Sequence, residues 1–600
     1  MKIKVVLQLL VPITMFLSLN SCGTSDHGAF PRDETFYVGG SQWGSPNTFN
    51  PLAWWSAFPI MSGGNHNIMY EHLLKYNILT GEVEPLLASL HERTNESVSV
   101  VMNSAAKWSD GEPLTSTDVD FTYRMSQRYS GVPSAYLWDY LTDMEIDTVE
   151  VDQQQKERIT FIMTGAKRHN PLAVLSILQA IRILPAHVLQ KRLEELGDSF
   201  SALQNERMDN NPVVSGPYNL YNYTSERIVL KRRDDYWGND ALYDGKEPAP
   251  RYIIHPILKD NAHFSLALQQ GSMDITSSFI PRIWRGERHG VRTWYPQEPY
   301  YVAGSIPTLV MNVTRKPLSD VNVRRAMVHA INYADIAELA VSGYSEDLQP
   351  GLILPFGNEA RYFSQEDADK YGRLFDPQKA KQVLADAGYT SEFDGRGRLR
   401  HMLDSNGEPL PPIDIMSPAG WTDWEAIVRL AVRDMRAVGI DVRERFVDAS
   451  IYWTSQPNGD FDMIMHTPAA DLTPAHPLAR FEAVMASRDW APIGTRMNEN
   501  YGRYNNPNAE NYNPAVDSLL KLIPVLNDEE EIIQAYRELN KHFMNDVPVL
   551  TLVYRPEQFY QFSIANWQNF PTSDNPYAPP QVPTVGAARD ILWQLTLNNN

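Results

Sequence analysis

The sequence predicts a mixed α/β protein that is divided into two or three lobes. Residues 97–102 (SVSVVM) and 159–163 are short runs typical of strands, and residues 117–128 are typical of a helix with acidic residues in its first turn. Residues 413–446 predict a complete β-α-β unit. A chain of 600 residues is too long for one hydrophobic core, which favours several lobes.

The N-terminal segment, residues 1–22, has the pattern of a secretory signal peptide. Lys2 and Lys4 give it a positive start, and the apolar run that follows is too short to remain as a membrane span. The segment ends in LNSC, which resembles the lipobox of bacterial lipoproteins, so Cys22 is the expected lipidation site. Residues 23–33 are expected to form a tether. We therefore expect a protein that is lipid-anchored to the bacterial cell membrane and faces the periplasm or the cell exterior.

Composition and motif spacing exclude several function classes. The formal net charge is -20 and there is no basic tract, which argues against nucleic acid as a partner. The single cysteine rules out a disulfide framework within the chain. The sequence contains no G-x-S-x-G, P-loop, H-E-x-x-H or C-x-x-C motif, and its 14 histidines are scattered. No motif singles out a catalytic site, and we expect no metal site and no cofactor.

Residues 39–55 (GGSQWGSPNTFNPLAWW) combine aromatic and turn-forming residues in an unusual density. Trp43, Trp54 and Trp55 lie among Gly, Pro and Asn, including Asn50, so the stretch is too broken for a long helix and too rich in turns for a core strand. The sequence therefore predicts a loop that carries a large aromatic surface.

The β-α-β unit supplies a second candidate loop. Residues 413–416 alternate like a strand, apolar residues then recur at helical spacing from Trp424 to Val438, and Gly439 ends the helix. Thr422 and Glu425 fit a capping box, which predicts a helix start within residues 418–424. Ligands collect at strand-to-helix loops in open α/β sheets, so Trp421 and Asp423 are candidate contacts. Trp424 lies on the apolar stripe, where a core role and a ligand role are both open.

Several further stretches, in order along the chain, resemble one family. They are residues 68–88 (IMYEHLLKYNILTGEVEPLLA), 105–123 (AAKWSDGEPLTSTDVDFTY), 215–223 (SGPYNLYNY), 232–238 (RRDDYWG), 267–275 (ALQQGSMDI), 309–332 (LVMNVTRKPLSDVNVRRAMVHAIN) and 501–510 (YGRYNNPNAE). From about Tyr37 to the C-terminus the chain resembles the extracellular solute-binding proteins of family 5, the peptide, nickel and oligosaccharide receptors of ABC importers. The resemblance implies a monomeric receptor without catalysis that closes on its ligand by hinge motion and delivers it to an ABC permease.

The implied fold is a two-lobed, periplasmic-binding-protein-like α/β fold of class II with an additional inserted domain and the ligand in the cleft between the lobes. The expected boundaries follow from this architecture. Lobe I should be discontinuous and the inserted domain should precede its second segment; the segments are 34–59, 206–305 and 554–600 for lobe I, 60–205 for the inserted domain and 306–553 for lobe II.

Within the family, the branch that imports cello-oligosaccharides and related β-glucosides resembles this chain at residues 40–52, 417–424 and 566–576. The chemistry agrees, because pyranose rings stack on indole and their hydroxyls suit Asn, Asp and Gln, while a neutral ligand needs no charge clamp. The expected ligand-binding residues are Trp43, Asn50, Trp55, Trp294, Asn312, Trp421, Asp423 and Trp424.

Two other functions remain open. An oligopeptide receptor would anchor the peptide termini, and Asp423 could accept an ammonium group; such a site needs a partner arginine facing the same cleft. A surface glycosidase would need two carboxylates roughly 5 to 10 Å apart across the ligand, and no spacing in the sequence singles out such a pair.

Overall fold

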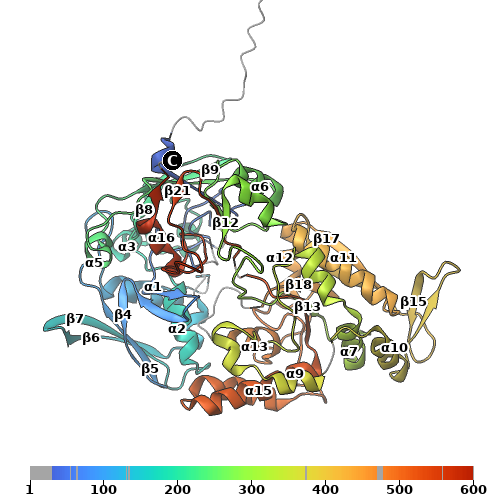
Figure 1. Cartoon of the computed structure of the whole chain (residues 1–600). Coiled ribbons are helices and arrows are strands. Elements are labelled where there is room, and N and C mark those ends of the chain that lie inside the picture. The colour runs from blue at the N-terminus through green and yellow to red at the C-terminus, as the bar shows by residue number, and fades with distance from the viewer. Residues whose placement is uncertain are drawn as a thin grey trace, which may run out of the picture.

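The computed structural model describes residues 30–53, 56–61, 65–129, 131–132, 135–371, 374–468, 477–556 and 558–598. The main sheets are distributed over distinct parts of the chain (Figure 1). Cys22 and the expected signal peptide lie outside the described residues, as does Trp55. None of the helices in the described residues is long and apolar enough to cross a membrane.

The first sheet combines strands from three separate stretches of the chain. Its order is β12 (Val291–Thr293), β20 (Gln561–Ser563), β11 (Ile275–Thr276), β1 (Thr35–Gly39), β10 (Tyr252–Pro256), β9 (Arg227–Arg232) and β8 (Tyr218–Tyr223). β1 is parallel to both β10 and β11. Helices α5 (Gly238–Tyr243), α6 (Asn261–Gln269) and α16 (Ile591–Gln594) belong to the same stretches.

The second sheet uses only residues between 308 and 551. Its order is β17 (Val442–Val447), β16 (Ile413–Pro418), β18 (Met463–His466), β13 (Thr308–Met311) and β19 (Val549–Thr551), with β16 parallel to β17 and β18. The accompanying helices are α7 (Val321–Ala330), α9 (Gln365–Tyr371), α10 (Pro377–Asp386), α11 (Thr422–Ala437), α12 (Ala449–Asn458), α13 (Leu478–Met485), α14 (Pro514–Leu522) and α15 (Glu529–Asp546), and β14 (Thr390–Phe393) pairs with β15 (Leu399–Leu403).

A third, antiparallel sheet lies between the first two segments of the first sheet. Its order is β4 (Ala88–Arg93), β5 (Ser97–Met102), β7 (Gln154–Ile162) and β6 (Asp143–Val151). Along the chain, the hairpin of β2 (Leu74–Asn77) and β3 (Glu82–Pro85) precedes this sheet, and α1 (Ser116–Arg128) lies between β5 and β6. The sheet is followed by α2 (Pro171–Ala180), α3 (Ala186–Glu195) and α4 (Phe200–Gln204). This distribution of strands supports the proposed division into lobe I, an inserted domain and lobe II.

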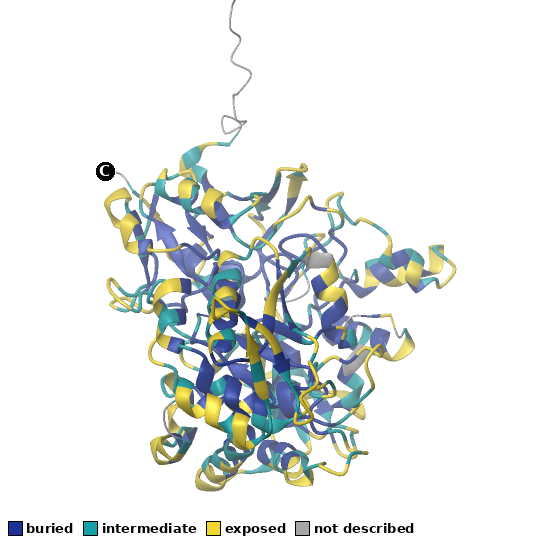
Figure 2. Ribbon diagram, turned by 90° about the vertical axis from the view of Figure 1, so that its right-hand side faces the viewer, coloured by how far each residue is buried: buried dark blue, intermediate teal, exposed yellow. Residues whose placement is uncertain are grey.

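The hydrophobic cores follow this division in part. One core contains buried residues only from positions 306 to 554, so lobe II has its own interior. A second core joins residues of the third sheet, such as Phe161, to residues of the first sheet, such as Phe36 and Phe562, so lobe I and the inserted domain share an interior. Figure 2 shows the buried segments in the interior and the exposed turns of helices along the outside.

The two lobes are joined by paired chain segments. The chain leaves lobe I after β12 and returns to it before β20, and the segments meet where Ser305 pairs with Arg555. The backbone N–H of Arg555 donates to the Ser305 carbonyl at 3.0 Å, and the Arg555 carbonyl accepts from the N–H of Ser305 at 2.9 Å. We propose this paired crossing as the hinge between the lobes.

Helix α11 shows how the local sequence produces the local structure. Its buried residues recur at helical spacing and pack into the lobe II core: Trp424, Ile427, Val428, Ala431, Val432 and Met435. The predicted capping box is wrong. The helix begins at Thr422, so Trp421 occupies the N-cap position and makes no side-chain cap, while Glu425 accepts a hydrogen bond from the Gly420 N–H at 2.8 Å.

Candidate functional site

The loops that follow parallel strands meet at one edge in each lobe. The carboxyl ends of parallel strands share a sheet edge, and ligands of open α/β sheets bind there. In lobe I, β1 leads into the Trp43 loop and β10 leads into α6. In lobe II, β16 leads into Trp421 and α11. Both lobes therefore present the kind of edge at which ligands are held.

Two polar contacts hold the edge of lobe II, one from the edge of lobe I and one from the paired crossing. Asn261, the first residue of α6, donates from Nδ2 to Oγ1 of Thr422, the first residue of α11, at 3.3 Å. Nε of Arg555, from the paired crossing, donates to Oδ2 of the buried Asp423 at 3.2 Å. In Figure 1, α6 lies next to the group formed by α11, α12 and β17. The edges of lobes I and II therefore lie against each other at α6 and α11, and we call the region between the lobes the interlobe cleft.

Lobe II carries an aromatic group at its edge. Trp421 lies edge-on to Trp424 at 4.7 Å between ring centroids and to Trp453 at 6.4 Å, and Trp453 lies edge-on to Tyr452 at 4.7 Å. Trp424 and Tyr452 are buried, Trp421 is half-buried, and Trp453 is 41% exposed. The buried rings therefore support two indoles, Trp421 and Trp453, that remain open to solvent. We call these four residues the tryptophan edge.

Lobe I supplies Trp43 on its loop. The Trp43 indole is 40% exposed and lies edge-on to Phe264 at 5.0 Å. Phe264 is one turn along α6 from Asn261, which contacts α11, so Trp43 packs against the helix that faces lobe II.

A buried histidine positions the Trp43 loop. Nε2 of His255 accepts hydrogen bonds from the backbone N–H groups of Ser41 at 3.2 Å and Gln42 at 3.1 Å. A ring nitrogen that accepts two N–H groups must be unprotonated. Burial lowers the pKa of His255 to about 4, which keeps the ring neutral near pH 7.

The remaining predicted residues lie elsewhere. Asn50 and Asn312 are fully buried, and their side-chain amides donate to main-chain carbonyls, at 2.7 Å to Leu203 and at 3.0 Å to Gly459. Because these amides serve the local backbone, we leave both residues out of the proposed site. Trp294 is buried and lines a separate pocket in lobe I. Trp424 is buried in the lobe II core, and we propose that it supports Trp421 rather than contacting the ligand.

Sequence reasoning missed Trp453, Asn261 and Arg555. Trp453 follows Tyr452 in α12, where the two adjacent rings differ in burial, and the local pattern does not indicate which of them faces the cleft. Arg555 is separated from Asp423 by 132 residues, so no local signal joins them. Arg555 meets the requirement stated for a peptide site, an arginine beside Asp423, and it forms an ion pair with that carboxylate.

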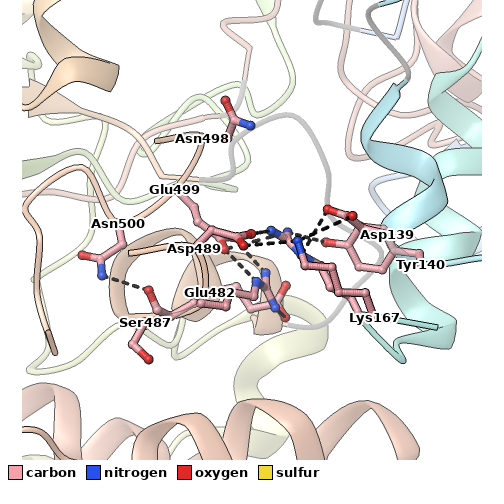
Figure 3. A network of polar contacts seen from close by, with 12 residues as sticks. Asp139, Tyr140, Lys167, Glu482, Ser487, Asp489, Asn498, Glu499 and Asn500 are labelled. Atoms are coloured by element: carbon pink, nitrogen blue, oxygen red, sulfur yellow. Dashed lines mark hydrogen bonds and ion pairs between the residues drawn. The ribbon is translucent and has the colours of Figure 1, made fainter. Parts of the chain in front are cut away.

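A second set of interlobe contacts lies between the inserted domain and lobe II (Figure 3). Arg168 of the inserted domain pairs with Asp489 of lobe II, and Nζ of Lys167 lies 3.2 Å from Oδ1 of the same carboxylate. Nη1 of Arg168 also lies 3.9 Å from Glu499. Glu499 is in turn bound by Arg488, at 2.6 Å from Nε to Oε1, within lobe II. This ion network therefore joins the inserted domain to lobe II, whereas the contact of Asn261 with Thr422 joins lobe I to lobe II.

Reversing one charge of this network should speed ligand release. In Arg168→Glu, the repulsion from Asp489 and Glu499 opposes the contact between the inserted domain and lobe II. Asp489 is 48% exposed, so we expect a modest effect, about threefold to tenfold in the ligand dissociation rate, with a smaller effect at high salt. Stopped-flow fluorescence at two ionic strengths measures it.

The matched control is the double variant Arg168→Glu/Asp489→Arg, which restores one pair of opposite charges. It should recover only part of the original rate, because the new acidic side chain still lies near Glu499 and the new basic side chain lies near Lys167. A double variant that releases ligand as fast as the single variant would show that this pair does not couple the two parts of the protein.

Two α/β lobes with facing sheet edges, joined by a paired crossing, define the class of two-lobed ligand-binding receptors. The chain belongs to the bacterial extracellular solute-binding proteins, family 5, whose model matches residues 82–482. It is the substrate-binding protein of an ABC importer and not an enzyme.

The relatives of this chain are named for different ligands. The probable peptide-binding protein YejA of Agrobacterium fabrum is 22% identical over 83% of this chain and 79% of its own length. The peptidoglycan-binding protein YepA of the same organism is 25% identical over 88% and 84%. The dipeptide-binding protein of Escherichia coli is 26% identical over 58% and 63%.

Solved structures confirm the two-lobed fold. A periplasmic oligopeptide-binding protein of Thermotoga maritima, solved with bound mannohexaose, is 28% identical, with a TM-score of 0.80 over 95% of this chain and 100% of that one. The oligopeptide-binding protein AppA of Bacillus subtilis, in complex with a nonapeptide, is 20% identical, with a TM-score of 0.66 over 94% and 99%. The latter shows the fold alone.

Proposed function

We propose that this receptor captures a neutral oligosaccharide, such as a cello-oligosaccharide or related β-glucoside, between the tryptophan edge of lobe II and the Trp43 loop of lobe I. The observation that carries the proposal is the pair of solvent-open indoles, Trp421 and Trp453, supported from below by buried Trp424 and Tyr452. Indole faces stack on the C–H faces of pyranose rings. The mannohexaose bound to the Thermotoga relative supports a sugar ligand for this type of cleft.

The charges at the cleft agree with a neutral ligand. Asp423 and Arg555 neutralise each other, so neither needs a charged partner from the ligand. A sugar hydroxyl can form a further hydrogen bond with either side chain without separating the ion pair.

An oligopeptide is the second candidate ligand, and the peptide-binding names of several relatives favour it. A peptide would bind if closure of the lobes separated Asp423 from Arg555. Asp423 would then bind the α-ammonium group of the peptide, and Arg555 would bind its α-carboxylate group. The two proposals therefore differ in what the ion pair does on binding.

A thermal-shift screen followed by calorimetry separates them. Cellotetraose, cellohexaose and mannohexaose are compared with tri- to hexapeptides, on the full-length mature protein and on Arg555→Gln. A sugar receptor should be stabilised by at least one oligosaccharide and retain most of that affinity in Arg555→Gln. Stabilisation by peptides alone, abolished in Arg555→Gln, would replace the first proposal by the second.

We also propose that Cys22 anchors the receptor to the membrane. Replacing it with serine should release the protein from the membrane fraction, because the lipid would be attached to a tether outside the lobes. Ligand affinity and thermal midpoint should not change. Fractionation after a high-salt wash measures the effect, and a Cys22→Ser protein that stays with the membranes would contradict the anchor.

A further inference from the structure

A separate pocket lies in lobe I beside β12, the edge strand of the first sheet. Its volume is about 450 Å³, which is in the range of small-ligand sites. All the residues that line it come from positions 283–300 and 562–574, so it includes nothing from lobe II or from the tryptophan edge. Its lining includes the buried apolar side chains of Trp294, Phe562 and Phe570.

The lining of the pocket also includes a stacked aromatic pair, which we call its aromatic wall. Trp284 and Tyr300 lie 5.7 Å apart between ring centroids at an interplanar angle of 23°. Trp284 is 40% exposed, although a large indole is usually buried more deeply. An exposed indole that a second ring fixes in place is a rigid flat surface with little conformational entropy left to lose on binding.

The backbone of Tyr300 has an energetically unfavourable conformation. Tyr300 has φ 63°, in the left-handed region that non-glycine residues rarely adopt. Such strain persists only where the surroundings impose it, and it is concentrated at ligand sites. Here the backbone N–H of Tyr300 donates to the Gln297 carbonyl at 2.9 Å, and its carbonyl accepts from the N–H of Tyr295 at 3.1 Å, so a closed turn presents the ring.

The rim supplies hydrogen-bonding groups. Gln568 and Asp574 line the pocket, and neither side chain makes a hydrogen bond to another part of the described chain. Arg292 is the one cation among the lining residues, and its Nη1 donates to the carbonyls of Glu287 at 2.9 Å and Val291 at 2.8 Å. Two carboxylates, Glu287 and Asp574, also line the pocket and outnumber this single cation, which disfavours an anionic ligand.

We propose that this pocket is a second carbohydrate site, which binds one pyranose ring against Trp284 and Tyr300 independently of the interlobe cleft. A buried apolar lining, an aromatic wall and a rim of amide and carboxylate groups match the C–H faces and the hydroxyls of a neutral sugar. All of its lining residues belong to lobe I, so the site would act whatever the cleft itself binds.

Fluorine NMR of the full-length mature protein labelled with 5-fluorotryptophan tests the proposal. Trp284→Phe and Trp294→Phe identify the two pocket resonances. The probes are methyl β-D-glucopyranoside and methyl α-D-mannopyranoside, with dialanine as the peptide probe. At least one glycoside should shift the Trp284 and Trp294 resonances saturably, while dialanine should not.

Two variants complete the test. Trp284→Ala, read through the Trp294 resonance, should weaken the glycoside at least about tenfold, the effect of one aromatic face. Trp453→Ala, in the cleft, should leave the pocket titration unchanged, and thermal melts check that both variants fold. The proposal would be overturned if the pocket resonances responded to no glycoside or responded equally to dialanine. It would also be overturned if Trp453→Ala, and not Trp284→Ala, abolished their response to the glycoside.

Discussion

Replacing Trp421 with alanine is expected to weaken oligosaccharide binding by about 1–3 kcal/mol, the scale of one aromatic face lost from a site. Trp421 is half-buried at the edge of lobe II and makes ring contacts with Trp424 and Trp453. The unfolding midpoint should change little, since part of the ring already faces solvent. Trp43→Ala, on the opposite lobe, should have a similar effect on affinity for the same reason.

Calorimetry and thermal unfolding on the same samples give both numbers. The matched control is Trp424→Ala, which opens a cavity under the tryptophan edge and should cost roughly 3–5 kcal/mol of folding stability. If Trp421→Ala instead lowered the midpoint as much as Trp424→Ala and left sugar affinity intact, Trp421 would be a core residue and the ligand would lie elsewhere.

Replacing Arg589 with methionine is expected to lower the folding stability strongly. Arg589 and Glu71 form an ion pair at 2.7 Å with both side chains fully buried. Glu71 also accepts from the Tyr236 hydroxyl at 2.6 Å and the Trp237 indole at 3.1 Å. Removing the guanidinium leaves a buried carboxylate without its countercharge, which typically costs about 3–5 kcal/mol.

The double variant Glu71→Gln/Arg589→Met separates this cause from simple loss of packing. The glutamine keeps an acceptor for Tyr236 and Trp237 but carries no charge, so the double variant should be more stable than Arg589→Met alone. Chemical denaturation, monitored by the fluorescence of the shared core, measures the free energy of unfolding of the single and the double variant. Equal stability of the single and double variants would show that the uncompensated charge is not the source of the loss.

The local pattern is a sound guide to elements such as α11. Its apolar residues recur every three or four positions because one helical face packs into the core, so the periodicity alone places Trp424, Ile427 and Met435 on that face. The cap is less predictable. Thr422 has the right residue type and spacing, but its hydroxyl accepts from Asn261 of lobe I, a partner 161 residues away, and the helix starts one residue earlier than a Thr422 cap requires.

By itself, the sequence determined the mixed α/β class, the absence of known catalytic motifs and, through the order of several weak motifs, the solute-binding family 5. Tertiary structure decided which side chains meet. It buried Asn50 and Asn312 against main-chain carbonyls, moved Trp294 into a separate pocket, paired Asp423 with Arg555 and added Trp453 to the edge. The physical reason is that helix and strand periodicity reports only which face of an element is buried. The partner of an exposed or polar group depends on how segments far apart in the chain pack together.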